Sequence, residues 1–217
     1  MTSSRVALAL CTLLLVPAAA AAQGPVAPVT VEPMPWVVAD VRVGWPAIGA
    51  DELTAQAIGR PATEMPGRAL TAGLGIHAYP LRRGRWKLGV GAELLRGRGS
   101  YQKKDTEGEP VGAQINRTLS AVSWQVSLNF GRGQGWSYVT AGTGPFRFDT
   151  FLGEGPGDSK GENTINFGGG ARWFKWQHAG FTADMRFYLT KASNGTQLVA
   201  PRGSTRVVVL SVGLTLK

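Results

Sequence analysis

The sequence has very little cysteine and histidine, with a single cysteine, Cys11, and two histidines, His77 and His178, among 217 residues. One cysteine cannot form an internal disulfide, and it cannot supply a zinc site that needs several thiolates. No group of histidines, cysteines and carboxylates has the spacing of a metal site. No glycine cluster matches a phosphate-binding loop that is followed by a helix. The sequence therefore predicts neither a cofactor nor a metal.

Long hydrophobic runs are also missing. After residue 22, no segment approaches the roughly 18 apolar residues that a membrane-spanning helix needs. Charged residues make up only 17% of the chain, whereas glycine occurs 30 times and tryptophan 7 times. Such a composition is typical of a sheet-rich protein. Any insertion into a membrane must then use a closed β-barrel, the other structure that satisfies its own backbone hydrogen bonds in lipid.

Residues 1–22 have the pattern of a secretory signal peptide. Arg5 precedes an apolar stretch over residues 6–16, and a small-residue tail ends in three alanines at Ala22, which gives the A-x-A form of a cleavage site. Cleavage near Ala22 would remove Cys11. The mature chain is therefore predicted to be exported and to contain no cysteine.

The rest of the chain divides into a short lead-in and a single domain. Residues 23–35 contain four prolines and are expected to form an extended periplasmic lead-in. Residues 36–217 are expected to form an outer-membrane β-barrel. The net charge of +9 is dispersed instead of gathered with aromatic residues on one face, as nucleic-acid binding would require. We therefore expect no nucleic-acid partner, and we attribute the charge to attraction for anionic lipid headgroups.

Eight segments of about ten residues alternate between apolar and polar side chains, which is the length of a tilted membrane-spanning strand. In the hairpin over residues 163–190, for example, Met185 and Phe187 alternate with Asp184 and Arg186. Because successive side chains of a strand point to opposite faces, each segment is predicted to be a strand with one apolar and one polar face. The predicted strands cover residues 36–45, 68–79, 85–96, 117–130, 136–147, 163–174, 181–190 and 205–216; the faces of the fifth stay unassigned.

Long connections alternate with short turns along these strands. The long ones are residues 46–67, 97–114, 148–162 and 191–204. An even strand number with long loops at one end and short turns at the other is typical of bacterial outer-membrane barrels. Aromatic residues near the turns would then form a girdle at the periplasmic interface; they are Trp36, Tyr79, Trp86, Phe130, Trp136, Trp173 and Trp176.

The polar faces of the predicted strands carry charges of both signs. An eight-stranded barrel has an interior that side chains just fill, and charges buried there must be paired. The sequence therefore predicts an ion-paired lumen. Its expected members are Asp40, Arg42, Lys87, Glu93, Arg117, Arg172, Asp184 and Arg186. A narrow small-solute channel is the alternative, because the pattern does not decide whether the lumen conducts.

Residues 36–216 resemble the small eight-stranded outer-membrane proteins of the OmpA-barrel and OmpX type. The segments NFGGGARWF (residues 166–174) and GFTADMRFYL (residues 180–189) are similar to the penultimate hairpin that is common in that superfamily. The resemblance implies an all-β, eight-stranded antiparallel up-and-down transmembrane β-barrel in the outer membrane of a Gram-negative-type bacterium. It implies a monomer whose partners are outer-membrane lipid, lipopolysaccharide and the outer-membrane assembly machinery. It also implies a structural or surface-interaction role through the long external loops.

A second resemblance concerns the five residues from Lys191 to Gly195. They are similar to the His-x-Ser-Asn segment of the outer-membrane lipid A deacylases, in which the histidine is the base for the serine. Here Lys191 occupies the histidine position, and no acidic residue follows it. Ser193 therefore lacks the base that would activate it. We expect a protein that is not an enzyme, with a lipid A 3-O-deacylase-like protein, inactive or using Ser193 as nucleophile, as the alternative.

Overall fold

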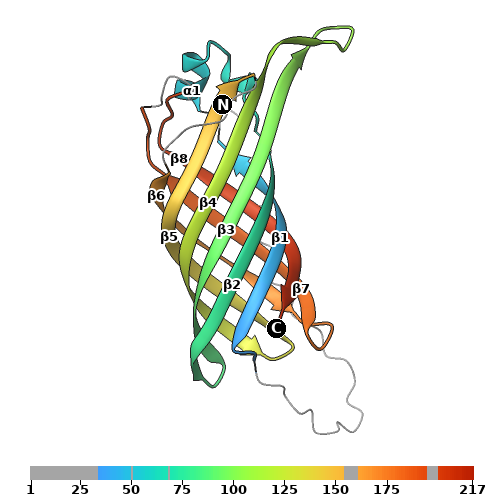
Figure 1. Cartoon of the computed structure of the whole chain (residues 1–217), viewed down its shortest axis with the longest axis vertical. Helices are drawn as coiled ribbons and strands as arrows, with labels where there is room; N and C mark the ends of the chain where they lie inside the picture. Colours follow the sequence, from blue (N-terminus) through green and yellow to red (C-terminus); the bar gives the residue numbers. More distant parts are fainter. Residues whose placement is uncertain (1–33, 50, 68, 154–160, 195–199) are drawn as a thin grey trace, which may run out of the picture. The chain divides into compact units, whose positions relative to one another are not determined.

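Eight antiparallel strands close into one barrel in chain order (Figure 1). The computed structural model describes residues 34–49, 51–67, 69–153, 161–194 and 200–217, so the expected leader and most of the expected lead-in lie outside the described residues. The strands are β1 Val37–Ile48, β2 Leu70–Arg83, β3 Trp86–Lys104, β4 Pro110–Arg132, β5 Gly135–Leu152, β6 Glu162–Trp173, β7 Ala179–Thr190 and β8 Thr205–Leu216. The predicted all-β up-and-down barrel is thereby confirmed.

The barrel closes where β1 pairs with β8, in register from Ala39 opposite Leu216 to Ile48 opposite Val207. At this seam the two backbones approach closely at Gly213. A Cβ atom on Gly213 would overlap the carbonyl oxygen of Val41 and lie 2.7 Å from the Cα of Arg42. Glycine is therefore required at this position of the closing pair.

Residues 97–114, predicted to be a long loop, are mostly strand. β3 and β4 remain paired as far as Lys104 opposite Pro110, and they form a hairpin that rises above its neighbours in Figure 1. Asp105 closes the turn, because its Oδ1 accepts hydrogen bonds of 2.9 Å from the backbone amides of Glu107 and Glu109. The apolar–polar alternation ends where the apolar exterior ends, but the backbone pairing of β3 with β4 continues beyond that point. The alternation therefore underestimated the length of these two strands.

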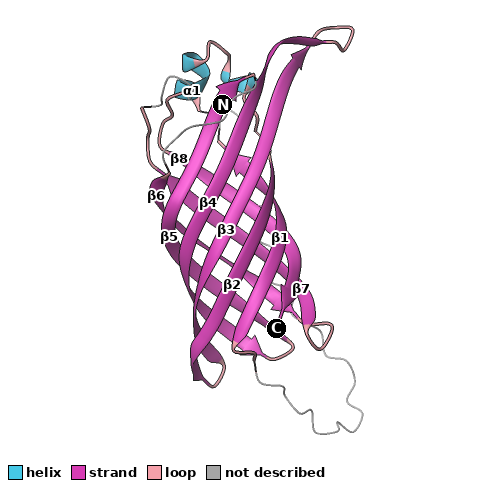
Figure 2. Cartoon of the chain, in the orientation of Figure 1, coloured by secondary structure: helices cyan, strands magenta, loops and turns pink. Residues whose placement is uncertain are grey.

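Residues 46–67, also predicted to be a loop, contain a short helix, α1 Glu52–Ala57, and a 3-10 turn, η2 Ala62–Glu64 (Figure 2). Asp51 caps α1, since its carboxylate accepts hydrogen bonds from the Thr54 amide at 3.4 Å and the Thr54 hydroxyl at 2.6 Å. Ala55, Met65 and Ile115 form a small apolar cluster. In the described part of the chain, no helix is long and apolar enough to cross a membrane.

The fifth strand now has assigned faces. Trp136, Tyr138, Thr140 and Phe146 are buried, and the side chains between them face outward. An irregularity lies at Pro145, where pairing between β4 and β5 is interrupted between residues 121 and 124 of β4. Proline has no amide hydrogen to donate, which accounts for an interruption at this point of the ladder.

An apolar surface covers the outside of the barrel. Runs such as residues 37–45 of β1 and 181–189 of β7 place only apolar side chains outward, and their length is close to the 9–11 residues of a tilted spanning strand. The apolar side chains of the predicted strands lie on this outer surface, which confirms the predicted apolar and polar faces; the exposed ones include Leu74, Val90, Val126, Phe167, Met185 and Leu210.

We expect Val126→Arg to lower the free energy of unfolding of the refolded barrel by about 2–4 kcal/mol, whereas Ser137→Arg should cost at most about 1 kcal/mol. Both side chains face outward and are exposed. Val126 lies midway along the apolar run of β4, whereas Ser137 lies near the turn between β4 and β5. Denaturant unfolding of protein refolded in lipid vesicles measures the difference. Equal costs would mean that the exterior does not face hydrocarbon.

Candidate functional site: the barrel lumen

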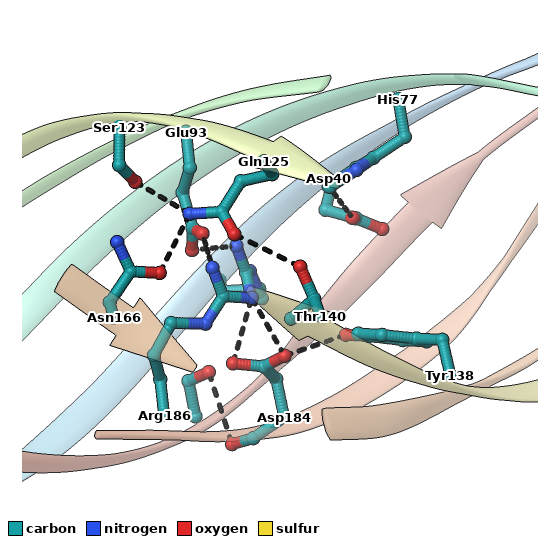
Figure 3. A network of polar contacts seen from close by, with 12 residues as sticks. Asp40, His77, Glu93, Ser123, Gln125, Tyr138, Thr140, Asn166, Asp184 and Arg186 are labelled. Atoms are coloured by element: carbon teal, nitrogen blue, oxygen red, sulfur yellow. Dashed lines mark hydrogen bonds and ion pairs between the residues drawn. The ribbon is translucent and has the colours of Figure 1, made fainter. Parts of the chain in front are cut away.

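Two arginines and two carboxylates meet at the centre of the lumen (Figure 3). Glu93 forms ion pairs with both Arg42 and Arg186. Asp184 forms ion pairs with the same two guanidinium groups, at 3.1 Å to Arg42 and 3.0 Å to Arg186. The Tyr138 hydroxyl donates a further hydrogen bond of 2.8 Å to Asp184. All of these side chains are at least 95% buried, so each charge is compensated by a partner and not by water.

A second ion pair lies beside this centre. Arg172 donates from Nε and Nη2 to the two carboxylate oxygens of Asp40, at 3.1 and 2.5 Å, which is bidentate geometry. Its Nη1 donates to the Tyr79 hydroxyl at 3.2 Å, and its guanidinium lies over the Tyr138 ring, 4.3 Å from the centroid. The buried His77 has its Nε2 3.9 Å from Asp40. Three guanidinium groups thus balance three carboxylates.

Neutral polar side chains surround the ionic centre. Gln125 donates to the Ser123 hydroxyl at 2.6 Å and to Asn166 Oδ1 at 2.9 Å, and it accepts from the Thr140 hydroxyl at 2.9 Å. Tyr138, Thr140 and Asn166 were absent from the predicted network. Asn166 could have been found from the polar parity of its strand, but Tyr138 and Thr140 lie on β5, whose alternation alone assigned no faces.

Two predicted members of the network lie apart from it. Lys87 is inward, but its ammonium group contacts the carbonyl oxygen of Gly84 at 3.4 Å, near the turn between β2 and β3. Arg117 is buried near the opposite mouth, where it donates to the Pro66 carbonyl at 2.7 Å and to the Thr150 hydroxyl at 3.1 Å. Inward parity alone does not bring either side chain into an ion pair with the central carboxylates Asp40, Glu93 and Asp184, because depth along the barrel also matters.

Arg202 was not singled out in the sequence, yet it helps to close the mouth near Arg117. It donates to the Phe148 carbonyl oxygen at 2.8 Å and lies 3.6 Å from Glu162. Burial lowers the pKa of Arg202, and the nearby carboxylates, Glu162 foremost, oppose that shift. The guanidinium stays charged at neutral pH. A loop arginine carries no periodic signal that would reveal such a contact.

The predicted aromatic girdle is wrong for two of its members. Tyr79 and Trp136 are only 0% and 3% exposed, because Tyr79 shares the inward parity of His77 and Trp136 shares that of Tyr138. They pack inside the barrel with Phe174, which stacks on Trp136 at a centroid distance of 4.9 Å. Here aromatic side chains fill the lumen toward the short turns.

The other predicted girdle residues lie at the surface. Trp36, Trp86, Trp173 and Trp176 are more than half exposed. Phe130 is half-buried and packs edge-on against Trp86, with ring centroids 4.5 Å apart. Their ring surfaces are therefore available to the surroundings of the barrel, as an interfacial girdle requires.

The lumen has almost no free space at its ionic centre. The cavity among Arg42, Glu93, Asp184 and Arg186 measures about 10 Å³, which is at the lower limit for a single water molecule. Beyond it, apolar side chains that include Phe146, Phe148 and Tyr188 form a packed cluster. The described side chains therefore leave no bore at these levels.

Ser193 lies far from both histidines along the barrel. It forms an isolated bridge with Arg202 beyond the end of β7, whereas His178 precedes the start of β7, at the opposite end of the same strand. His77 is buried next to Asp40. The exposed Lys191 accepts a hydrogen bond from Arg202 through its carbonyl oxygen, at 3.4 Å. Neither histidine is placed to activate Ser193.

No protein-family model and no curated protein matches the chain. Among solved structures, Neisserial surface protein A gives a TM-score of 0.49 at 12% identity, over 86% of this chain and 99% of its own. Ail, the attachment invasion locus protein of Yersinia pestis, in complex with sucrose octasulfate, gives 0.45 at 11%, over 83% and 99%. The outer membrane protease OmpT of Escherichia coli gives 0.42 at 10%, over 83% and 96%. Identities this low assign neither activity nor ligand.

Fold and lumen together define the class of protein: a closed eight-stranded antiparallel barrel with an apolar exterior and a packed, charged interior. The predicted architecture, an eight-stranded antiparallel up-and-down barrel, is confirmed. Within the described residues, no group of histidine, cysteine and carboxylate side chains could hold a metal ion.

Proposed function

We propose that the chain is an integral outer-membrane β-barrel protein with a side-chain-filled lumen. The observation that carries the proposal is the reversal of polarity across the barrel wall. Met185 of β7 and Leu210 of β8 face outward and are 39% and 52% exposed, whereas Asp184, the residue before Met185 on β7, is 3% exposed. In water this arrangement would expose a continuous apolar surface and bury charge. In a bilayer the same apolar exterior contacts lipid hydrocarbon, which is favourable.

A structural or surface-interaction role fits the lumen better than a channel. A conducting pore needs a continuous water-filled path, but Arg42, Arg186 and their carboxylates occupy the centre with about 10 Å³ to spare. Each of these charges already has partners within the protein. The centre of the lumen therefore offers a solute neither space nor an unpaired charge, and we assign any specificity to the outside of the barrel.

The β3–β4 hairpin is the external element that we assign to surface contacts. β2 pairs with β3 only as far as Arg98, and β5 pairs with β4 only from Ile115 onward. Beyond these residues both outer edges of the hairpin lack a neighbouring strand from the described barrel. An edge without a neighbouring strand can accept a strand from a partner. Lys103, which also forms an ion pair of 3.1 Å with Glu64 of η2, and the exposed Lys104 limit indiscriminate pairing. A paired hairpin also presents a more rigid surface than a loop.

We further propose that the chain is not an enzyme. A serine hydrolase needs a base within hydrogen-bond reach of the nucleophile. Both histidines of the chain lie elsewhere: His77 is in the lumen and His178 is at the opposite end of β7 from Ser193. The position of Ser193 beside Arg202 supports a structural contact of the external loops.

The expected lack of cysteine in the mature chain allows a direct test of location and orientation. We expect Glu107→Cys, in the β3–β4 turn, to react on intact cells with a maleimide carried on a long polyethylene glycol. Lys175→Cys, in the turn between β6 and β7, should react only after the outer membrane is permeabilised. Both side chains are exposed, so accessibility alone does not separate them.

The parent chain is the control, because it labels only if Cys11 is retained. Lipid A extracted from the same cells should have the mass found in cells without the protein. Labelling of both cysteine variants, or of neither, on intact cells contradicts the proposed orientation. Deacylated lipid A that is lost in Ser193→Ala contradicts the non-enzymatic role.

A further inference from the structure

Three exposed arginines flank a cleft on the outer wall of the barrel. Arg96 of β3 and Arg147 of β5 are aligned with Ser120 of β4, which lies between them in the cross-strand register. Arg98 lies two residues further along β3, opposite Thr118. These side chains line a cleft of about 730 Å³. The strands that carry it, β2 to β5, lie side by side in Figure 1.

The positive charge of this cleft is not neutralised within the described part of the chain. Neither Arg96 nor Arg147 has an acidic partner there, and Arg98 has a single weak contact, to Asn116 Oδ1 at 3.5 Å. The carboxylate in the lining, Asp149, is 3% exposed and faces inward. The three guanidinium groups differ in this from Arg42, Arg172 and Arg186 in the lumen, each of which forms an ion pair with a carboxylate.

The cleft lies where the apolar exterior ends. On β3 the outward residue changes from Leu94 to Arg96, and on β4 it changes from Val122 to Ser120. Leu94 and Val122 are opposite each other in the register, one step of two residues, or about 7 Å, from the charged row. A ligand held by the arginines would therefore have its adjoining part against the apolar wall that begins at Leu94 and Val122.

We propose that this cleft binds the phosphorylated headgroup of an outer-leaflet lipid. Adjacent strands are about 4.8 Å apart, so the backbones of Arg96 and Arg147 are about 10 Å apart, which their long side chains can bridge around one phosphate. Guanidinium groups bind phosphate in bidentate fashion, and the hydroxyl groups of Ser120 and Thr118 can donate further hydrogen bonds. The apolar wall next to the row takes the acyl chains.

This inference rests on the proposed membrane location but is tested without it, since purified protein refolded in detergent micelles is sufficient. The variant Arg96→Gln/Arg98→Gln/Arg147→Gln removes three exposed charges from the cleft. The matched control, Arg83→Gln/Arg85→Gln/Arg132→Gln, removes three exposed charges near the short turns at the opposite end. Recovery of the heat-modifiable, compact form on gels shows that each variant refolds.

Binding is measured by native mass spectrometry with three probes: lipid A carrying both phosphates, the same lipid dephosphorylated, and inorganic phosphate. We expect the cleft variant to bind phosphorylated lipid A at least tenfold more weakly than the parent, and the control to stay within twofold. Dephosphorylated lipid should bind both variants and the parent equally weakly. Equal losses in the two variants overturn the proposal, because net charge alone would then explain binding. If millimolar inorganic phosphate displaces the lipid, the cleft binds free phosphate and the proposal of a lipid ligand is wrong.

Discussion

Replacing Asp184 with alanine should lower the free energy of unfolding of the barrel by about 3–5 kcal/mol, the cost of removing one partner from a buried ion pair. Asp184 contacts Arg42, Arg186 and the Tyr138 hydroxyl. Its removal leaves two guanidinium groups with Glu93 as their remaining carboxylate partner at the centre of the lumen. Asp184→Asn should cost less, since the amide oxygen still accepts hydrogen bonds although the charge is lost.

Equilibrium unfolding in denaturant, with refolded protein in vesicles, measures these costs. Glu107→Ala is the control, because its exposed side chain lies in the β3–β4 turn, where one charge is worth under about 1 kcal/mol. The same preparations can be recorded in planar bilayers, where the parent should show no conductance steps. If Asp184→Ala unfolds like the parent, or if the parent conducts steadily, the lumen is not a packed ionic core.

Replacing Gly213 with alanine should prevent most of the protein from closing into a barrel. The added Cβ would overlap the Val41 carbonyl oxygen across the β1–β8 seam and would lie 2.9 Å from the Cγ of Arg42. Ordinary overpacking of a core costs about 1–3 kcal/mol. Here the obstacle is backbone and cannot move without separating the closing strands. The folded fraction, read from the mobility of unheated protein on gels, should fall sharply.

Gly73→Ala is the matched control for this change. Gly73 also faces the lumen, on β2, and it lies opposite Arg42 on the other side of β1. A Cβ atom there would be 3.6 Å from the Leu95 Cδ1, an ordinary contact. This variant should therefore refold like the parent. If both alanine variants refold equally well, the close approach at the seam does not limit closure.

Side-chain parity could be predicted from the sequence, because it follows from the geometry of a strand. It placed Asp184 and Arg186 inside and Met185 outside before any pairing was known. The choice of partners could not be predicted, since it depends on the stagger of the strands. Asp184 and Arg186 are two residues apart on β7, yet Asp184 forms an ion pair with Arg42 of β1, whereas Arg186 forms one with Glu93 of β3.

The errors have two physical causes. Tyr79 and Trp136 were placed in the girdle because aromatic residues near turns suit an interface, but an aromatic ring of inward parity fills a lumen equally well. The outer part of the β3–β4 hairpin was missed because its residues no longer alternate between apolar and polar. Beyond the apolar exterior of the barrel, both faces of the hairpin are exposed to water. In each case the sequence signal reports the surroundings of a side chain, not the backbone pairing itself.

The lumen ion pairs bear on how the barrel wall can open. Arg42 of β1 is paired with Asp184 of β7, and Asp40 of β1 is paired with Arg172 of β6. Both contacts cross the β1–β8 seam through the interior. Separating the seam sideways would therefore break two buried ion pairs as well as the backbone ladder, and would turn four charges toward hydrocarbon. The first strand is held from inside to β6 and β7, so a lateral exit for lipid between β1 and β8 is opposed by these ion pairs as well as by the ladder.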